Sequence, residues 1–380
     1  MPYLFETDEH ASLRAEVRRF AERAIAPNAH AWDEAGEFPR ALYADAGDAG
    51  VLGVGFPTEL GGAGGDLSHV IAAAEELVLA GTSPGVALSL GSHGIGLPPI
   101  LHLGTDAQKR RFLPPVLRGE KISALAITEP GAGSDVAGIT TRAVRDGDHY
   151  AVDGAKLYIT SGNRADYVTC AVRTGGPGHA GVSLLVVERG TPGFTTGRPL
   201  KKMGMWASDT AELVFENCRV PAGNLLGEEG SGFVALMQNF VAERLALACH
   251  CVAIGELAYR ASCAYVRERR AFGKTLSGFQ VVRHKLADMA TSLAAARALT
   301  GEVTARAVRG ESAAPLAAMA KNAATDMVRH VTDEAVQLHG GMGYMRESLV
   351  ERLYRDARLY AIGGGAREIM NELIARVEGY

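Results

Sequence analysis

The sequence reads Ile127-Thr128-Glu129-Pro130-Gly131-Ala132-Gly133-Ser134-Asp135 at the point where helical patterning gives way to strand-like patterning. Glycines at this place let a backbone approach a ligand closely, and Thr128 and Ser134 offer hydroxyl groups. No helix follows the segment, which excludes a Rossmann-type dinucleotide turn. Taken alone, the stretch is equally well interpreted as a ligand-binding loop or as an ordinary glycine-rich turn.

The chain can be divided into three regions by the secondary structure that its residue patterns predict. The first region is helical, with apolar residues at helical spacing from Leu13 to Ile25. Short β-branched runs separated by turn formers follow, and they predict an antiparallel sheet or small barrel. Long proline-poor stretches then predict helices over 231–270, 280–309, 315–338 and 366–378. We therefore predict a mainly α protein with a helical N-terminal domain (1–120), a β-barrel-like middle domain (121–230) and a C-terminal four-helix bundle (231–380).

Composition limits the class of protein. Of 380 residues, 47% are hydrophobic and 22% are charged, and the net charge is −4. These values are typical of a globular chain and give no electrostatic reason to expect nucleic acid as a partner. The first ten residues include early acids and no apolar run, so we expect no signal peptide, and no run of about 20 apolar residues predicts a membrane span.

The cysteines predict neither disulfides nor a metal site. There are five, an odd number, and none forms a CxxC pair. Reduced, buried thiols in a cytoplasmic protein are the expected state. Cys249, His250 and Cys251 are consecutive on a predicted helix, where neighbouring side chains point to different faces and cannot converge on one ion. We therefore expect no metal.

Four further segments carry groups that can bind a ligand. In Leu157-Tyr158-Ile159-Thr160-Ser161-Gly162, Tyr158 and Thr160 share one strand face, although the ordinary interpretation is a strand before a turn. The others are Arg269-Arg270-Ala271-Phe272-Gly273-Lys274, Gln337-Leu338-His339-Gly340-Gly341-Met342-Gly343-Tyr344 and Gly363-Gly364-Gly365. Each also has a plain structural interpretation, such as a solvated helix end or a glycine C-cap.

In order and spacing, these segments together resemble the acyl-CoA dehydrogenase family over essentially the whole chain. The matching stretches are ITEPGAGSD at 127–135, LYITSG at 157–162, RRAFGK at 269–274 and QLHGGMGY at 337–344. The resemblance implies an FAD cofactor, an acyl-CoA substrate of fatty acid β-oxidation, electron-transferring flavoprotein as the acceptor, and a homotetramer built as a dimer of dimers.

The resemblance also assigns contacts to FAD. From the two strand-end motifs they are Leu125, Ile127, Thr128, Gly133, Ser134, Tyr158 and Thr160, with Ser134 also near the substrate. Across a subunit interface they are Arg269, Phe279, Gln280, Gln337, Gly340 and Gly341, and Phe272 belongs to the same motif as Arg269. Tyr158 stands where many members have tryptophan, while Ala271 and Ala366 stand where relatives often carry threonine.

The reaction needs a carboxylate, because the α proton beside a thioester carbonyl is weakly acidic. Short- and medium-chain members place a glutamate at the position of Gly364, which here has no side chain. The long-chain and isovaleryl branches place it at the position of Glu243 instead. The resemblance thus implies Glu243 as the base, with a pKa that burial raises. It implies that Gly364 binds the thioester oxygen through its N–H, that Arg244 and Gly365 contact the substrate, and that Glu368 is the nearest rival base.

The leading hypothesis is therefore FAD-dependent α,β-dehydrogenation of an acyl-CoA to a trans-2-enoyl-CoA in the long-chain and isovaleryl-like branch. Two alternatives stay open on the sequence. One is an acyl-CoA oxidase or flavin monooxygenase on the same scaffold. The other is a non-catalytic acyl-CoA- or flavin-binding relative.

Overall fold

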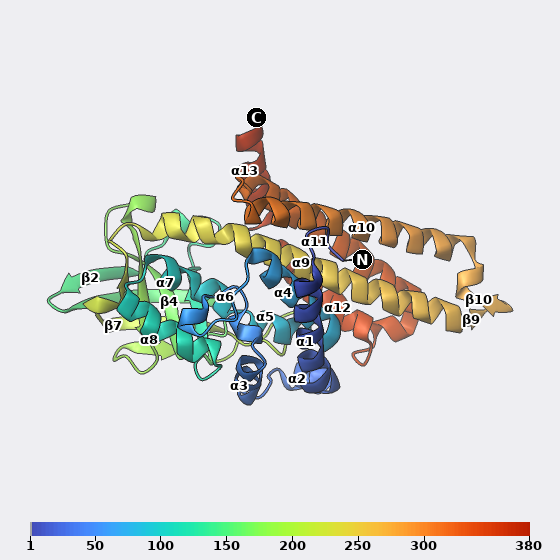
Figure 1. Ribbon diagram of the computed structural model, residues 1–380, viewed down its shortest axis with the longest axis horizontal. Helices are drawn as coiled ribbons and strands as arrows, with labels where there is room; N and C mark the ends of the chain where they lie inside the picture. The colour runs from blue at the N-terminus through green and yellow to red at the C-terminus, as the bar shows by residue number, and fades with distance from the viewer. Residues whose placement is uncertain (1) are drawn as a thin grey trace.

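The computed structural model describes residues 2–380 and has a β-sheet region at one end of a long helical body (Figure 1). The helical N-terminal region packs along one side of that body. Its helices are α1 (Asp8–Ala24), α2 (Ala29–Ala35), α3 (Ala41–Asp48), α4 (Leu67–Gly81), α5 (Pro84–Leu90), α6 (His93–Gly96), α7 (Pro98–Leu103) and α8 (Asp106–Leu117).

One segment of this region, Pro84–Leu103, is long and apolar enough to cross a membrane by length and composition. Half of the most apolar part of this segment is buried inside the protein, and the segment is divided among α5, α6 and α7. Leu90, Leu97 and Ile100 belong to the buried core. The apolar character is therefore accounted for by packing within the fold.

The middle region is a mixed sheet in the order β6-β7-β3-β2-β4-β5-β8, with β1 beside β4. Its strands are β1 (Ser123–Ala126), β2 (Arg142–Asp146), β3 (His149–Thr160), β4 (Tyr167–Arg173), β5 (Val182–Glu188), β6 (Phe194–Thr196), β7 (Thr210–Pro221) and β8 (Leu225–Leu226). The prediction of an antiparallel sheet or small barrel holds for most strand pairs, but β1 and β2 both pair with β4 in parallel. The connection from β1 to β4, residues 127–166, contains β2 and β3 and is long enough for the crossover that a parallel pair needs.

The C-terminal region is built on three long helices, α9 (Gly232–Glu268), α10 (Gln280–Val308) and α11 (Ala314–His339). Pro315 lies in the first turn of α11, where a proline ring costs no backbone hydrogen bond. A two-stranded hairpin, β9 (Arg270–Ala271) and β10 (Lys274–Thr275), joins α9 to α10, and α12 (Leu349–Ala357) and α13 (Arg367–Glu378) complete the region. The predicted fold class, a β region between two helical regions, is confirmed.

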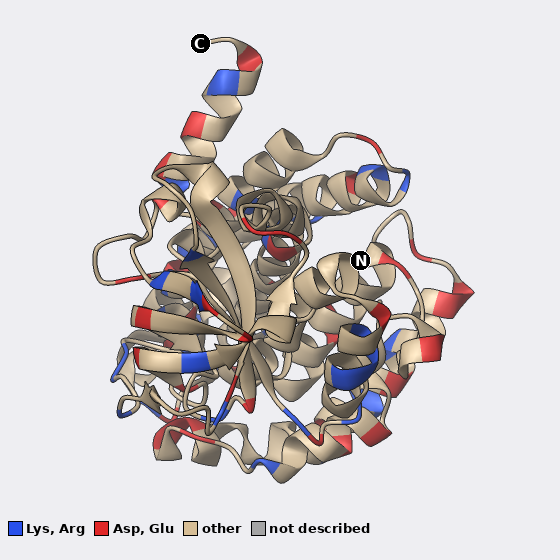
Figure 2. Ribbon diagram, turned by 90° about the vertical axis from the view of Figure 1, so that its left-hand side faces the viewer, with Lys and Arg blue, Asp and Glu red and all other residues tan. Residues whose placement is uncertain are grey.

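A buried ion network fixes α1 and α4 against the long helices. Arg14 of α1 lies 2.6 Å from Glu75 of α4, and Arg297 of α10 lies 2.8 Å from the same carboxylate. Because removal of one partner would leave a charge buried without compensation, the network strongly restricts how these helices dock. On the outside, basic and acidic residues are interleaved along the helices and loops (Figure 2).

Candidate active site

Glu243 of α9 faces the glycine turn 363–365 that precedes α13. A Cβ atom built on Gly364 would lie 3.3 Å from Oε1 of Glu243 and 2.4 Å from Cδ1 of Leu247. Gly364 has a φ of +65° and Gly365 a φ of +99°, values that favour glycine. The two positions that the sequence singles out for the base therefore address one small volume, and only one of them can carry a side chain into it.

The Glu243 carboxyl group is poised for proton transfer near neutral pH. The residue as a whole is half-buried, but its Oε2 atom is closed off from solvent without a hydrogen-bond partner. Burial raises the pKa of Glu243 to about 7, and the positive charges of Arg244 and Lys321 partly oppose that rise. Other buried carboxyl oxygens among the described residues also lack a hydrogen-bond partner, such as Oδ2 of Asp356, but Glu243 is the one that faces the glycine turn.

Two cations hold the carbonyl groups of the glycine turn. Arg244 Nε donates to the Gly364 carbonyl at 3.5 Å, a long bond, while its guanidinium lies 5.3 Å from the centroid of the Phe240 ring. Lys321 Nζ of α11 donates to the Gly365 carbonyl at 2.5 Å. The turn is thus anchored from α9 and from α11. The predicted substrate residues Arg244, Gly364 and Gly365 lie together with Glu243.

Tyr158 lies on β3 in a conformation that aromatic residues rarely adopt. Its φ is +61°, and a register shift between Lys156 and Ile159 marks a bulge at this point of the β3–β7 pairing. The Tyr158 side chain is 66% exposed, whereas Ile159 is buried and Thr160 is half-buried. Such strain of roughly 1–2 kcal/mol is typical of ligand-binding positions.

Two residues, Asp209 and Arg189, hold the turn after β3 through hydrogen bonds. Asp209 accepts from the Ser161 N–H through its carbonyl at 3.0 Å and from the Asn163 N–H through its carboxylate at 2.8 Å. Arg189 donates to the carbonyls of Gly162 and Asn163, both at 3.0 Å. The end of β3 that carries Tyr158 and Thr160 is therefore rigidly placed.

A buried ion pair closes the loop 127–141. Lys156 Nζ donates to Glu129 at 2.7 Å and to the Ile127 carbonyl at 3.0 Å. Glu129 also accepts from the backbone N–H groups of Thr140 and Thr141 at 2.6 and 2.9 Å. Burial alone would raise the pKa of Glu129, but the Lys156 ammonium and these hydrogen bonds lower it to about 2. The predicted site did not include Lys156, although its place two residues before Tyr158 on an inward-facing strand position was a usable signal.

The middle of the loop 127–141, which carries predicted ligand-binding residues, is exposed. Gly133 and Ser134 are exposed, and a Cβ atom built on Gly133 would meet nothing within 4 Å. The Leu157 N–H donates to the Thr128 carbonyl at 2.8 Å, which joins this loop to β3 just before Tyr158. Leu125, Ile127 and Thr128 are half-buried beside it. The two strand-end motifs are therefore joined where Thr128 meets Leu157, next to Tyr158.

The remaining predicted cofactor residues lie elsewhere in the chain. Arg269 follows Glu243 by 26 positions, about 39 Å along α9 at 1.5 Å per residue. The β9–β10 hairpin lies at the end of the body away from the sheet (Figure 1). Phe272 at its tip is 95% exposed, with a φ of +49°. One chain alone does not bring this hairpin to Tyr158.

The predicted residues at the end of α11 lie on the hairpin side. The ring of Tyr265 stacks on His339 with centroids 4.3 Å apart, which joins the last turn of α9 to the last turn of α11. Gln337, Gly340 and Gly341 are exposed there. Phe279 is half-buried and Gln280 exposed at the start of α10, where Lys274 Nζ lies 4.1 Å from the centroid of the Phe279 ring.

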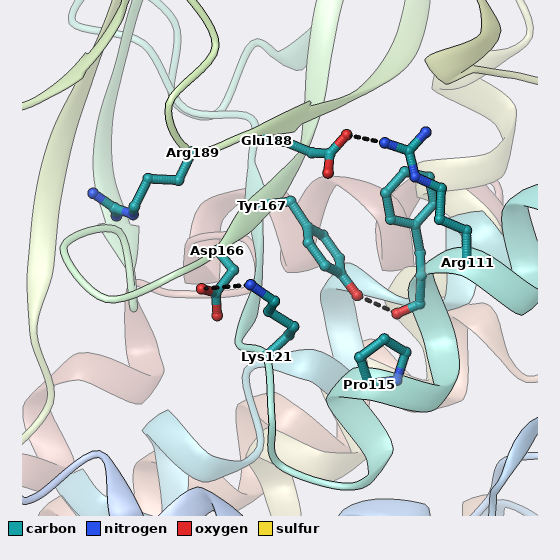
Figure 3. Close-up of a pocket in the computed structure, with 8 residues that line it drawn as sticks. Arg111, Pro115, Lys121, Asp166, Tyr167, Glu188 and Arg189 are labelled. Carbon is teal, nitrogen blue, oxygen red and sulfur yellow. Dashed lines mark hydrogen bonds and ion pairs between the residues drawn. The ribbon is translucent and has the colours of Figure 1, made fainter.

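Neither of two cavities includes Glu243. One of about 270 Å³ lies between α8 and the sheet and is lined by side chains that pair with one another, such as Arg111 with Glu188 and Lys121 with Asp166 (Figure 3). The other, of about 560 Å³, runs along the first turns of α9 and includes Phe233, Met237 and Val241. We locate the site at Glu243 because the chemistry of its carboxyl group points there, whereas the charged groups of the first cavity are paired with one another or, for Arg189, bonded to backbone carbonyls.

Comparisons with known proteins show the family to which the chain belongs. Three family models match: the acyl-CoA dehydrogenase N-terminal domain at 7–120, the middle domain at 124–218 and the C-terminal domain at 230–378. The mitochondrial long-chain specific acyl-CoA dehydrogenase of Sus scrofa is 42% identical over 97% of this chain and 86% of its own.

Solved structures are similarly close. The acyl-CoA dehydrogenase of Geobacillus kaustophilus is 42% identical with a TM-score of 0.95, and the match covers all of both chains. An acyl-CoA dehydrogenase complexed with FAD from Bacillus anthracis is 30% identical, with a TM-score of 0.92 over 98% of this chain and 68% of that one. The chain is an oxidoreductase that belongs to the acyl-CoA dehydrogenase family.

Proposed function

We propose that the protein catalyses FAD-dependent α,β-dehydrogenation of an acyl-CoA thioester to a trans-2-enoyl-CoA, with Glu243 as the base. One observation carries the proposal. The carboxyl group of Glu243 faces Gly364 with a buried, unpartnered oxygen, and its pKa is raised to about 7. A base with a pKa near the working pH combines a useful ionised fraction with a useful proton affinity.

Glu243 takes the α proton while the electron pair of the α C–H bond forms the new double bond. The β hydrogen leaves with its own electron pair, and FAD, when bound, supplies the acceptor for that hydride. The Gly364 N–H is assigned to the thioester carbonyl, where it stabilises the negative charge that develops as the proton leaves. Loss of one such donor typically costs about 3 kcal/mol of barrier. Arg244 and Gly365 are assigned to the rest of the thioester end of the substrate.

The described residues fit an FAD molecule. Tyr158 offers an exposed aromatic face on a strained, buttressed strand end, and the loop with Gly133 and Ser134 is open toward solvent. We propose that Tyr158 and Thr160 contact the edge of the isoalloxazine ring of FAD. Residues 125–134 would contact the neighbouring part of the flavin. Since Arg269 lies about 39 Å from Glu243 along α9, we assign Arg269 and the nearby Phe272 to the FAD of another subunit in a homotetramer. That contact would cover the exposed Phe272 side chain.

We further propose the long-chain and isovaleryl-like branch, a role in fatty acid β-oxidation, a cytoplasmic location, and electron-transferring flavoprotein as the acceptor. The assignment to this branch rests on the presence of Glu243 together with a glycine at 364, and the similarity to a long-chain relative supports it. The acceptor rests on family resemblance.

The direct test replaces Glu243 by Gln in the FAD-loaded protein and follows the visible flavin absorbance after anaerobic addition of a panel of acyl-CoAs. We expect bleaching by at least one acyl-CoA in the wild type and none in the variant, with FAD retained. Glu368→Gln is the matched control, because Glu368 is an exposed carboxylate in the first turn of α13. Bleaching that persists in Glu243→Gln and disappears in Glu368→Gln would refute the assignment. Rapid reoxidation in air would indicate an oxidase.

A further inference from the structure

Lys321 is a buried lysine next to the proposed site. It lies on α11, is 1% exposed, and donates from Nζ to the carbonyl of Gly365 at 2.5 Å. Lys156, the other fully buried lysine among residues 2–380, is neutralised by Glu129 at 2.7 Å. No carboxylate within residues 2–380 is close enough to Lys321 for an ion pair of 4.0 Å or less. A buried ammonium with only a carbonyl partner is costly to maintain, so its presence calls for a reason.

The geometry connects Lys321 to the base through two adjacent residues. Gly365, whose carbonyl Lys321 holds, follows Gly364, whose position lies against Oε1 of Glu243. The neighbour of Lys321, Asn322, donates to the side chain of Asn371 on α13 at 2.9 Å. One turn of α11 therefore holds both the glycine turn and the helix that follows it.

We propose that Lys321 is a positioning residue of the acyl-CoA dehydrogenase site, which fixes the glycine turn through the Gly365 carbonyl and places a positive charge near the Glu243 carboxylate, beyond ion-pair distance. This inference rests on the proposed function of Glu243. The fixed turn keeps the Gly364 N–H in place for the thioester oxygen. The charge favours the ionised form of a base that burial would otherwise keep protonated.

The charges around the pair are few. Glu243 is faced by Arg244 on its own helix and by Lys321 on α11, while the glycine turn contributes no ionisable side chain. Lys321 is faced by Glu243, Arg244 and Cys251. Burial lowers the pKa of Lys321 to about 8, and the Cys251 and Glu243 groups partly oppose that change. The ammonium is therefore still mostly charged at pH 7, where Glu243 must ionise.

Three substitutions separate the charge of Lys321 from its hydrogen bond. Lys321→Gln keeps a donor without charge, Lys321→Met removes both, and Lys321→Arg keeps the charge. The readout is the pH at which the anaerobic bleaching rate of the FAD-loaded enzyme reaches half its maximum. We expect this midpoint to rise by about one pH unit in Lys321→Gln and Lys321→Met, the lower end of the effect of a nearby opposite charge. The pH midpoint should be unchanged in Lys321→Arg and in the distant control Lys109→Met on α8.

A second readout does not depend on turnover. Infrared difference titration of the Glu243 carboxyl group, identified by its loss in Glu243→Gln, should show the same upward shift in the substrate-free protein. If Lys321→Met does not fold, Lys321→Gln decides by both readouts. An unmoved midpoint in Lys321→Gln with FAD bound, or an equal shift in Lys321→Arg, would overturn the charge assignment. Failure of the wild type to bleach would instead overturn the proposed function itself.

Discussion

The pH dependence of flavin bleaching tests the proposed role of Glu243 most sharply. With its pKa at about 7, the Glu243 carboxyl group is about one tenth ionised at pH 6 and about nine tenths ionised at pH 8. The second-order rate constant of bleaching at limiting acyl-CoA, which reports the ionisation of the free enzyme, should therefore rise about tenfold between these values. An unperturbed glutamate, with a pKa of about 4.3, would be almost fully ionised throughout and would give a flat profile.

Substitutions at Glu243 should change this profile in distinct ways. Glu243→Gln abolishes bleaching at every pH because the amide cannot accept the α proton. Glu243→Asp withdraws the carboxylate by about 1.5 Å, one carbon–carbon bond, and should slow bleaching on the order of 100-fold while ionisation is retained. Stopped-flow absorbance under anaerobic conditions measures both, with Glu368→Gln as the control. A wild-type profile that is flat from about pH 5.5 to 8.5 would refute the reasoning.

The same carboxyl group links stability to pH in the substrate-free protein. Because the folded state raises the pKa of Glu243 from 4.5 to about 7, its favourable contribution is complete below the unfolded value and is lost as pH rises through 7. The full shift corresponds to about 3 kcal/mol, which partial exposure reduces to about 1–2 kcal/mol. Glu243→Gln should therefore gain stability relative to wild type between about pH 5 and 8. Thermal unfolding at matched scan rates measures the difference, and a constant or reversed difference would contradict it.

Three further substitutions test the surroundings of the site. Gly364→Glu should lower both the stability and the rate of flavin bleaching. Its Cβ would lie 2.4 Å from Leu247, on a backbone with a φ of +65°. Unchanged thermal unfolding and unchanged bleaching kinetics would contradict this contact. Tyr158→Ala should weaken FAD retention in gel filtration while Tyr158→Phe retains it, because the aromatic face is the proposed contact, and equal retention would exclude that role. Lys156→Met should cost about 3–5 kcal/mol, since it leaves the Glu129 carboxylate buried without its partner; a loss below 1 kcal/mol in thermal unfolding, with FAD retained, would show that the pair does not hold the loop.

Local patterns were sufficient for the long helices and the main strands of the fold, but not for shorter elements such as α12. The start of α10 at Gln280 and the proline in the first turn of α11 follow from spacing and helix-start signals. The strand runs of the middle region were also readable, because β-branched residues and turn formers alternate there. The parallel pairing of β1 with β4 was not readable, because it depends on the path of residues 127–166, which include β2 and β3.

By itself, the sequence determined the family, the three-part architecture and the absence of a side chain at 364, since these rest on residue identity and order. Only the tertiary structure decided that Glu243 and Gly364, 121 positions apart, address one volume, because contact at such a separation depends on helix packing rather than on local pattern. It also revealed the strained Tyr158 and the buried Lys321. Backbone strain and the cost of a buried charge are properties of surroundings, and no single stretch of sequence records them.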